Sequence, residues 1–360
     1  MKDYSDTDDL YTNSTIWQKL GNEPRIAFLD IDLTITGSAK TQQDIRSLFE
    51  QNGYSIVFVT SRPYELLLSD ASLSRSPRLS RPPSKIALDK NNTYYHVDLA
   101  QIESFAGLLD PDALADTTGA RIYLRQHTGE YRRDRDYDVI DLSAAQWREQ
   151  ILDLLKTISN TLSNFKLKNI EDISNYEKGF ATISPPDFRI QIDFKDNKEK
   201  KLFRKHISKL NPPIYTLDDS EPEKNTYSLF LFPRQADFLK AQAVDRIIDR
   251  ILKTKGIYPD KLSVFLSGDS FADVNMGINS AKGTRATFFL PGGARMSRYF
   301  SDKTIQDYDD VDISLWKKQL KQKAPGHYEL QGREIYISDE LFPGALAGES
   351  LLHFLQNIYF

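Results

Sequence analysis

A strand–helix–strand pattern near the start of the chain limits the fold more than any other feature. Residues 26–29 are a short apolar run bounded by polar residues, which predicts a strand buried on both faces. Apolar residues recur at spacings of three and four over residues 41–51, which predicts a helix. Residues 56–59 form a second apolar run. Two buried strands joined by one helix form a βαβ unit, and this unit predicts a parallel α/β sheet.

The same α/β pattern returns in the last third of the chain. Helical periodicity covers residues 240–253, and apolar runs at residues 263–266 and 285–290 predict two more strands. A hairpin is expected at residues 328–337, and an apolar helix at residues 344–355. The two ends of the chain therefore predict one α/β core.

The middle of the chain has a different order of elements. It predicts a hairpin within residues 121–142, helices over residues 144–162 and 198–210, and strands at residues 181–183, 188–194 and 228–232. This order lacks the alternation of strand and helix, so we expect a separate α+β unit. The expected division is a core domain over residues 24–136 and 236–360, an inserted domain over residues 137–235, and an N-terminal tail over residues 1–23. The tail is polar and acidic, which favours a loose segment or a surface helix around residues 16–20.

Composition excludes several classes of function. The 360 residues include 47 Lys and Arg and 51 Asp and Glu, so the net charge of −4 argues against a protein that mainly binds nucleic acid or anionic lipid. The absence of cysteine excludes disulfides, thiolate metal sites and cysteine nucleophiles. The sequence has no run of about 18 apolar residues and no apolar N-terminal signal segment, so we expect a cytoplasmic protein without a membrane span.

Acidic and hydroxyl residues follow three of the predicted strands. Asp30 and Asp32 follow the first strand, Thr60 follows the second, and Asp269 and Asp273 follow residues 263–266. The carboxyl ends of the strands in an open α/β sheet form the ligand crevice, so these side chains should converge there. Four carboxylates in one crevice would repel one another unless a cation neutralised them. Carboxylate oxygens suit Mg²⁺ bound together with a phosphate, so the sequence predicts a magnesium site.

Two further groups fit phosphoryl chemistry. Lys240, at the start of its predicted helix, can neutralise a phosphate dianion or a nucleophile. Thr60 offers a hydroxyl and backbone N–H groups to phosphate oxygens. Because the chain has no cysteine, the plausible nucleophile is a carboxylate that forms an aspartyl-phosphate.

These residues lie in four ordered motifs, and the set resembles the haloacid dehalogenase (HAD) superfamily of phosphatases. The motifs are Asp30-Ile31-Asp32-Leu33-Thr34, Thr60 at a strand end, Lys240 within residues 238–243, and Gly268-Asp269-Ser270-Phe271-Ala272-Asp273. The order of the motifs and their strand or helix context carry the resemblance. It implies a Rossmann-like parallel-sheet core with an inserted α+β cap domain.

The resemblance also implies a role for each acidic residue. Asp30 would attack the phosphorus atom and become phosphorylated. Asp32 would protonate the leaving oxygen and then activate water. The carboxylates of Asp30 and Asp269, with the backbone carbonyl of Asp32, would hold Mg²⁺.

Other residues of the motifs are expected to bind the phosphoryl group or to support it. By the same resemblance, Thr60, Ser61 and Lys240 would hold the phosphoryl oxygens. Asp273 would orient Lys240 or support the metal ligands.

The position of the middle unit is similar to that of the large cap in one HAD branch. This branch contains sucrose-phosphate, trehalose-phosphate and mannosyl-phosphoglycerate phosphatases and phosphomannomutases. Residues 175–180 are loosely similar to a cap segment that presents a lysine to the substrate. Lys178 is therefore a candidate substrate-binding residue, as is Arg62, although Lys178 also fits a solvated surface position. The resemblance implies a Mg²⁺-dependent phosphatase, similar to the sucrose-6-phosphate phosphatases, that acts on a small phosphorylated sugar or glycoside.

Two alternatives stay open at this point. A phosphosugar mutase would use the same nucleophile but return the phosphoryl group to a sugar. A catalytically weak HAD fold could act as a sugar-phosphate sensor or as a partner of a glycosyltransferase. The presence of both Asp30 and Asp32 argues against the second alternative, because a protein that only binds could lose either residue.

Overall fold

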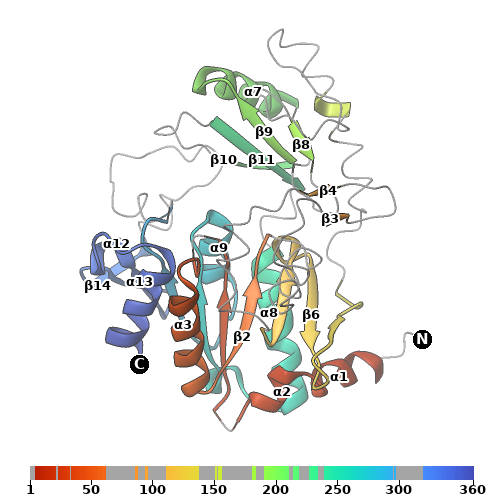
Figure 1. Ribbon diagram of the computed structural model, residues 1–360, viewed down its shortest axis with the longest axis vertical. Coiled ribbons are helices and arrows are strands. Elements are labelled where there is room, and N and C mark those ends of the chain that lie inside the picture. Colours follow the sequence, from red (N-terminus) through yellow and green to blue (C-terminus); the bar gives the residue numbers. More distant parts are fainter. Residues whose placement is uncertain are drawn as a thin grey trace. The chain divides into compact units, whose positions relative to one another are not determined.

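The computed structural model describes most of the two ends of the chain and parts of its middle (Figure 1). The described residues are 5–21, 23–32, 34–61, 86–87, 94–95, 111–137, 151, 153–155, 181–183, 190–210, 214–218, 227–233, 239–294, 296 and 319–360. The chain divides into two compact units. Unit 1 comprises Met1–Lys85, His96–Asp138 and Phe238–Phe360, and unit 2 comprises Ile86–Tyr95 and Val139–Asp237.

Unit 1 contains a ten-stranded sheet in the order β14-β15-β16-β13-β12-β1-β2-β5-β6-β7. Its strands are β1 (Arg25–Leu29), β2 (Tyr54–Val59), β5 (Ala113–Asp116), β6 (Arg121–Arg125), β7 (Tyr131–Arg133), β12 (Ser263–Ser267), β13 (Arg285–Leu290), β14 (Lys321–Ala324), β15 (His327–Leu330) and β16 (Arg333–Ile337). The six strands from β16 to β5 are parallel, and antiparallel strands extend the sheet at both edges. The predicted α/β class with a parallel sheet is confirmed.

The central strands are buried on both faces. In β1, four of the five residues are buried, and Phe28 pairs with Leu266 of β12 on one side and with Val57 of β2 on the other. A strand with both faces covered needs apolar residues at successive positions, since neighbouring side chains point to opposite faces. The short apolar runs in the sequence are therefore the parallel strands of the core.

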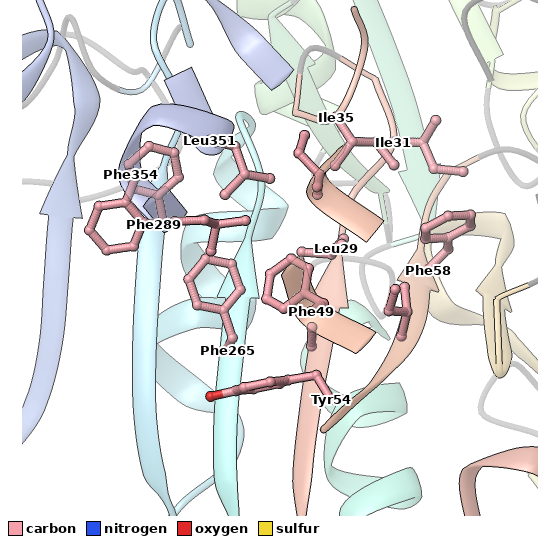
Figure 2. Close-up of a cluster of buried hydrophobic side chains, with 14 of the residues drawn as sticks. Leu29, Ile31, Ile35, Phe49, Tyr54, Phe58, Phe265, Phe289, Leu351 and Phe354 are labelled. Carbon is pink, nitrogen blue, oxygen red and sulfur yellow. The ribbon is translucent and has the colours of Figure 1, made fainter. Parts of the chain in front are cut away.

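Helices flank this sheet. They are α3 (Ala39–Gln51), α8 (Leu239–Lys255), α9 (Phe271–Asn279), α12 (Ser338–Leu341) and α13 (Ala347–Phe354). Helices α3 and α13 lie side by side (Figure 1) and contribute Phe49, Leu351 and Phe354 to one core cluster. Figure 2 shows these side chains packed against Leu29 of β1 and other residues of the central strands. Helices α8 and α9 also pack against strands of the sheet.

The N-terminal segment is helical and not loose, and its second helix lies within one residue of the helix expected around residues 16–20. It forms α1 (Ser5–Thr12) and α2 (Thr15–Lys19), and the side chains of Tyr11 and Ile16 are buried. The Tyr11 hydroxyl donates to Asp134 Oδ2 at 3.0 Å, and the Arg246 guanidinium pairs with the same carboxylate. Burial of Tyr11 raises its pKa well above the ordinary value, and the negative charge of Asp134 adds to the effect. Asp134 and Arg246 are distant from Tyr11 in the sequence, so the composition of the N-terminal segment could not predict these contacts.

Several predicted elements of unit 1 occur where the sequence placed them. Helices α3 and α8, strands β12 and β13, and the β15–β16 hairpin match their predicted ranges to within two residues. The expected final helix begins later, at Ala347, and ends in a π-helical turn, Leu355–Tyr359. Strands β6 and β7 form a hairpin, and residues 138–142 of the predicted range lie outside the described residues. The sequence did not predict α1, β5, α9, β14 and α12.

Unit 2 contains a four-stranded antiparallel sheet in the order β10-β11-β9-β8. These strands are β8 (Ala181–Ile183), β9 (Ile190–Phe194), β10 (Ile214–Asp218) and β11 (Tyr227–Pro233), and α7 (Asn197–Leu210) contacts β9 and β11. Two further short strands, β3 (Ile86–Ala87) and β4 (Tyr94–Tyr95), pair with each other. The Phe194 and Phe203 rings lie 5.2 Å apart in the core of the unit. Of the predicted helix over residues 144–162, only residues 151 and 153–155 are described, and they are helical.

Among the described residues, the helices are all too short or too polar to cross a bilayer.

Candidate phosphoryl-transfer site

The parallel strands bring the acidic motifs to one edge of the sheet. Asp30 directly follows β1, and its N–H donates to the Ser267 carbonyl at the end of the neighbouring strand β12 (2.9 Å). Asp269 lies two residues beyond that end. Thr60 directly follows β2, on the other side of β1, and its N–H donates to the Ala115 carbonyl of β5 (2.9 Å). Because these strands run in the same direction, their carboxyl ends place Asp30, Thr60 and Asp269 at the same edge.

Lys240 reaches this edge from the first turn of α8. Its Nζ donates to Asp30 Oδ1 at 2.8 Å and to Asp273 Oδ1 at 2.5 Å. The side chains of all three residues are buried. Burial alone would lower the pKa of Lys240, but the carboxylates of Asp273 and Asp30 outweigh it and raise the pKa above its usual range. Lys240 is therefore a fixed positive charge directly beside Asp30.

Asp273 has two structural partners. Its Oδ1 accepts from Lys240, and its Oδ2 accepts from the Ser270 N–H at 3.0 Å and from the Ser270 hydroxyl. Ser270 and Asp273 form the capping box that begins α9. One carboxylate therefore starts the helix and orients the lysine.

The turn between β12 and α9 requires a glycine. A Cβ at Gly268 would lie 2.2 Å from Cβ and Cγ of Asp273, which no side chain can tolerate. Gly268 therefore allows Asp273 to approach the end of β12 closely.

The acidic cluster fits a divalent cation. One carboxylate oxygen from each of Asp30, Asp269 and Asp273 lies within 4.8 Å of the others, and all three residues are buried. Burial raises the pKa of Asp30 to about 7; the charges of Asp273 and Asp32 add to the increase, and Lys240 opposes it. One ammonium cannot balance three ionised carboxylates, so a cation would favour their charged forms. Hard carboxylate oxygens suit Mg²⁺.

Asp30 and Asp269 are the better candidates for metal ligands. Both oxygens of Asp273 already accept hydrogen bonds from Lys240 and Ser270. Asp32 is half-buried and close enough to Asp30 for its charge to raise the pKa of that residue. Of the residues expected to bind the phosphoryl group, Thr60 is buried and Ser61, the next residue, is half-buried. The two candidate substrate-binding residues, Arg62 and Lys178, lie outside the described residues.

Sequence reasoning did not identify two features of the site. The first is Ser270, whose hydroxyl and N–H hold Asp273; the Ser-x-x-Asp spacing of a capping box could have revealed it. The second is the turn Thr117–Gly119, whose Thr118 N–H donates to the Thr60 carbonyl at 2.8 Å. No local pattern connects residues 60 and 118, because only the pairing of β2 with β5 brings them together.

The comparisons with solved structures include a sucrose-phosphatase, a haloacid dehalogenase-like hydrolase and an IMP-nucleotidase. The sucrose-phosphatase from Synechocystis, in complex with sucrose and phosphate, is 12% identical, with a TM-score of 0.46 over 93% of this chain and 98% of that chain. A haloacid dehalogenase-like hydrolase from Bacillus subtilis is 13% identical, with a TM-score of 0.44 over 92% and 99% of the two chains. The IMP-nucleotidase from Plasmodium falciparum is 13% identical, with a TM-score of 0.36 over 71% and 57%.

No family model and no curated protein matches the sequence. The TM-scores of the three structures named above are all below 0.5.

Proposed function

We propose that this protein is a Mg²⁺-dependent phosphatase of the HAD type that hydrolyses a phosphate monoester of a sugar or glycoside. The observation that carries this proposal is the buried contact of Lys240 with Asp30 and Asp273, beside Asp269, at the carboxyl ends of parallel strands. This arrangement supplies a carboxylate nucleophile, a fixed cation and a candidate metal site within a few ångströms. Phosphoryl transfer requires mainly positioning and charge neutralisation, and these groups provide both.

The proposed reaction has two steps at Asp30. A carboxylate oxygen of Asp30 bonds to phosphorus while the bond from phosphorus to the sugar oxygen breaks, and Asp32 gives its proton to that leaving oxygen. Asp32 then takes a proton from water, whose oxygen attacks phosphorus and releases inorganic phosphate from Asp30. Mg²⁺ bound by Asp30 and Asp269 would neutralise phosphoryl charge.

Other residues would hold the phosphoryl group during both steps. Lys240, which is positioned by Asp273, would pair with its negative charge. Thr60 and Ser61, at the end of β2, would offer hydrogen bonds to its oxygens.

Unit 2 is the proposed cap that selects the sugar. Its described strands and helix form a compact α+β unit with its own core, and most of it lies in the sequence between Asp138 and Phe238 of unit 1. A cap can enclose the sugar and exclude water while the core holds the phosphate. Lys178 and Arg62 are the proposed substrate contacts. We also propose that the enzyme is cytoplasmic.

Phosphate release from a substrate panel tests the proposal. The panel contains sucrose 6-phosphate, trehalose 6-phosphate, glucosylglycerol phosphate, mannosyl-3-phosphoglycerate and hexose phosphates, each with Mg²⁺ and with EDTA. We expect one substrate to react much faster than the others, with activity lost in EDTA and in Asp30→Asn. Asp44→Asn is the matched control, because Asp44 lies on α3 in an exposed ion pair with Lys40.

The panel also gives two results that would contradict the proposal. A folded protein that releases no phosphate from any member would contradict hydrolysis. Movement of the phosphoryl group between positions of a hexose, without release, would indicate the mutase instead.

A further inference from the structure

Thr118 has an unfavourable backbone conformation. It is the middle residue of the turn Thr117–Gly119, between β5 and β6, and its φ and ψ angles are 63° and 22°. This left-handed region is a genuine outlier for a β-branched residue, whereas glycine or asparagine adopts it readily. Such strain persists only where the surrounding structure holds it, and it often occurs at ligand sites.

The hydroxyl of Thr118 carries a second penalty. The residue is only 6% exposed, and among the described residues Oγ1 has no hydrogen-bond partner. A buried hydroxyl normally finds a partner, so each exception calls for an explanation such as a ligand or a bound water. A glycine at position 118 would remove both penalties, so two independent observations indicate a role for this side chain.

Surrounding contacts prevent the turn from relaxing. The Ala120 N–H donates to the Asp116 carbonyl at 2.9 Å, and the Asp116 carboxylate pairs with the Arg121 guanidinium. The buried Tyr137 hydroxyl donates to the Gly119 carbonyl at 3.1 Å. The turn is thus fixed on both sides of Thr118.

The turn that holds Thr118 contacts two residues that the proposed function assigns to the phosphoryl group. The Thr118 N–H donates to the Thr60 carbonyl at 2.8 Å. A Cβ at the adjacent Gly119 would lie 2.9 Å from Cα of Lys240 and 2.6 Å from the Leu239 carbonyl oxygen, so the turn rests directly on the start of α8. The unpartnered hydroxyl therefore belongs to a turn that contacts Thr60 through Thr118 and the start of α8 at Lys240 through Gly119.

We propose that the Thr118 hydroxyl is a further ligand-binding group of this site and donates a hydrogen bond to an oxygen of the bound phosphoryl group. This inference rests on the proposed function. Lys240 supplies charge, and Thr118 supplies a neutral, directional donor held in place by a rigid turn. Binding would give the buried hydroxyl the partner that the protein itself does not provide.

Thr118→Val and Thr118→Ser test the hydroxyl separately from the backbone. Valine keeps the β-branched shape and the backbone penalty but removes the donor, whereas serine keeps the donor. Two readouts are used: hydrolysis of p-nitrophenyl phosphate with Mg²⁺, and thermal stabilisation by inorganic phosphate. We expect Thr118→Val to lower kcat/KM about tenfold to a hundredfold, as for a lost hydrogen bond to a charged group. Phosphate stabilisation should weaken in parallel, and Thr118→Ser should stay close to wild type in both readouts.

The possible outcomes separate this inference from the proposed function. An active wild type together with a fully active Thr118→Val would overturn the role of the hydroxyl and leave the phosphatase intact. A wild type that is inactive but stabilised by phosphate would contradict the phosphatase, and the variants would still test Thr118 through phosphate binding. Neither activity nor stabilisation in wild type would overturn both. If the valine variant does not fold, Thr118→Gly replaces it, because glycine accepts these backbone angles and also lacks the hydroxyl.

Discussion

Replacement of Lys240 by methionine tests the electrostatic design of the site. Methionine has a similar length and an apolar, flexible side chain, so Lys240→Met removes the charge and leaves little empty space. The change deletes the hydrogen bonds from Nζ to Asp30 Oδ1 and to Asp273 Oδ1. Two buried carboxylates then lose their shared cation.

The expected cost is large because the three groups are almost completely buried. Lys240, Asp30 and Asp273 have side chains that are 5%, 6% and 0% exposed. Removing one partner of a buried ion pair typically costs about 3–5 kcal/mol, since the remaining charge stays without compensation. In a unit of about 250 residues, that loss corresponds to a decrease in Tm of roughly 10 °C.

The size of this loss should depend on pH. In wild type, the pKa of Lys240 is raised in the folded protein. The ion pairs of Lys240 therefore contribute fully to stability at every pH below the ordinary pKa of a lysine. Without the cation, the already raised pKa of Asp30 rises further, so the folded variant holds a proton that the unfolded chain has already released above about pH 4. Stability of the variant therefore falls as pH rises, and the loss should be larger at pH 8 than at pH 5.5.

Urea unfolding in EDTA at these two pH values measures the effect. Lys40→Met is the matched control, because Lys40 is 82% exposed and its ion pair with Asp44 should contribute only about 0.3–0.5 kcal/mol. A Lys240→Met loss no larger than that of the control, or equal at both pH values, would refute the reasoning that Lys240 neutralises buried carboxylates.

Three further predictions concern the turn after β12, the nucleophile and the core. Gly268→Ala should lower kcat about a hundredfold or more, because the new Cβ would lie 2.2 Å from Asp273 and displace it; an unchanged kcat for phosphate release would contradict this. Burial raises the pKa of Asp30 to about 7, so the folded protein keeps a proton that the unfolded chain releases near pH 4, and stability falls as pH rises from about 4 to about 7. Calorimetry in EDTA should therefore show that the Tm of Asp30→Asn, relative to the Tm of wild type, is higher at pH 8 than at pH 5.5. The opposite order would count against a raised pKa of Asp30. Phe354→Ala should cost about 3–5 kcal/mol in urea unfolding, because its ring is buried and stacks on Phe289 at 4.5 Å, whereas Ile358→Ala, at a side chain 43% exposed, should cost less than about 1 kcal/mol.

The sequence alone determined the class of the core and the residues at its functional edge. Strands β1, β2, β12 and β13 are short apolar runs, because a parallel strand covered on both faces needs apolar residues at successive positions. Chain direction then places whatever follows these strands at one edge of the sheet. For this reason the position of Asp30, Thr60 and Asp269 could be predicted before any contact was known.

Some elements carried no local signal. Strand β5 has the sequence Ala-Leu-Ala-Asp and β14 has Lys-Gln-Lys-Ala, neither with an alternating pattern, and both owe their conformation to pairing with neighbouring strands. Helix α1 likewise depends on partners such as Asp134, which is 123 residues from Tyr11. Tertiary contacts determined these elements because their local propensities are weak.

Only the tertiary structure decided how the functional groups pair. The resemblance implied that Asp273 could orient Lys240. Because Lys240 is 210 residues from Asp30 and 33 from Asp273, however, only the folded chain shows that one ammonium contacts both carboxylates. The strained turn at Thr118 depends on Gly119 packing against α8 and on the hydrogen bond to Thr60. The sequence shows which residue types are available for the site. Their pairing, burial and charge balance require distant segments to fold together, because electrostatic energies depend on the distance between charges and on the exclusion of water.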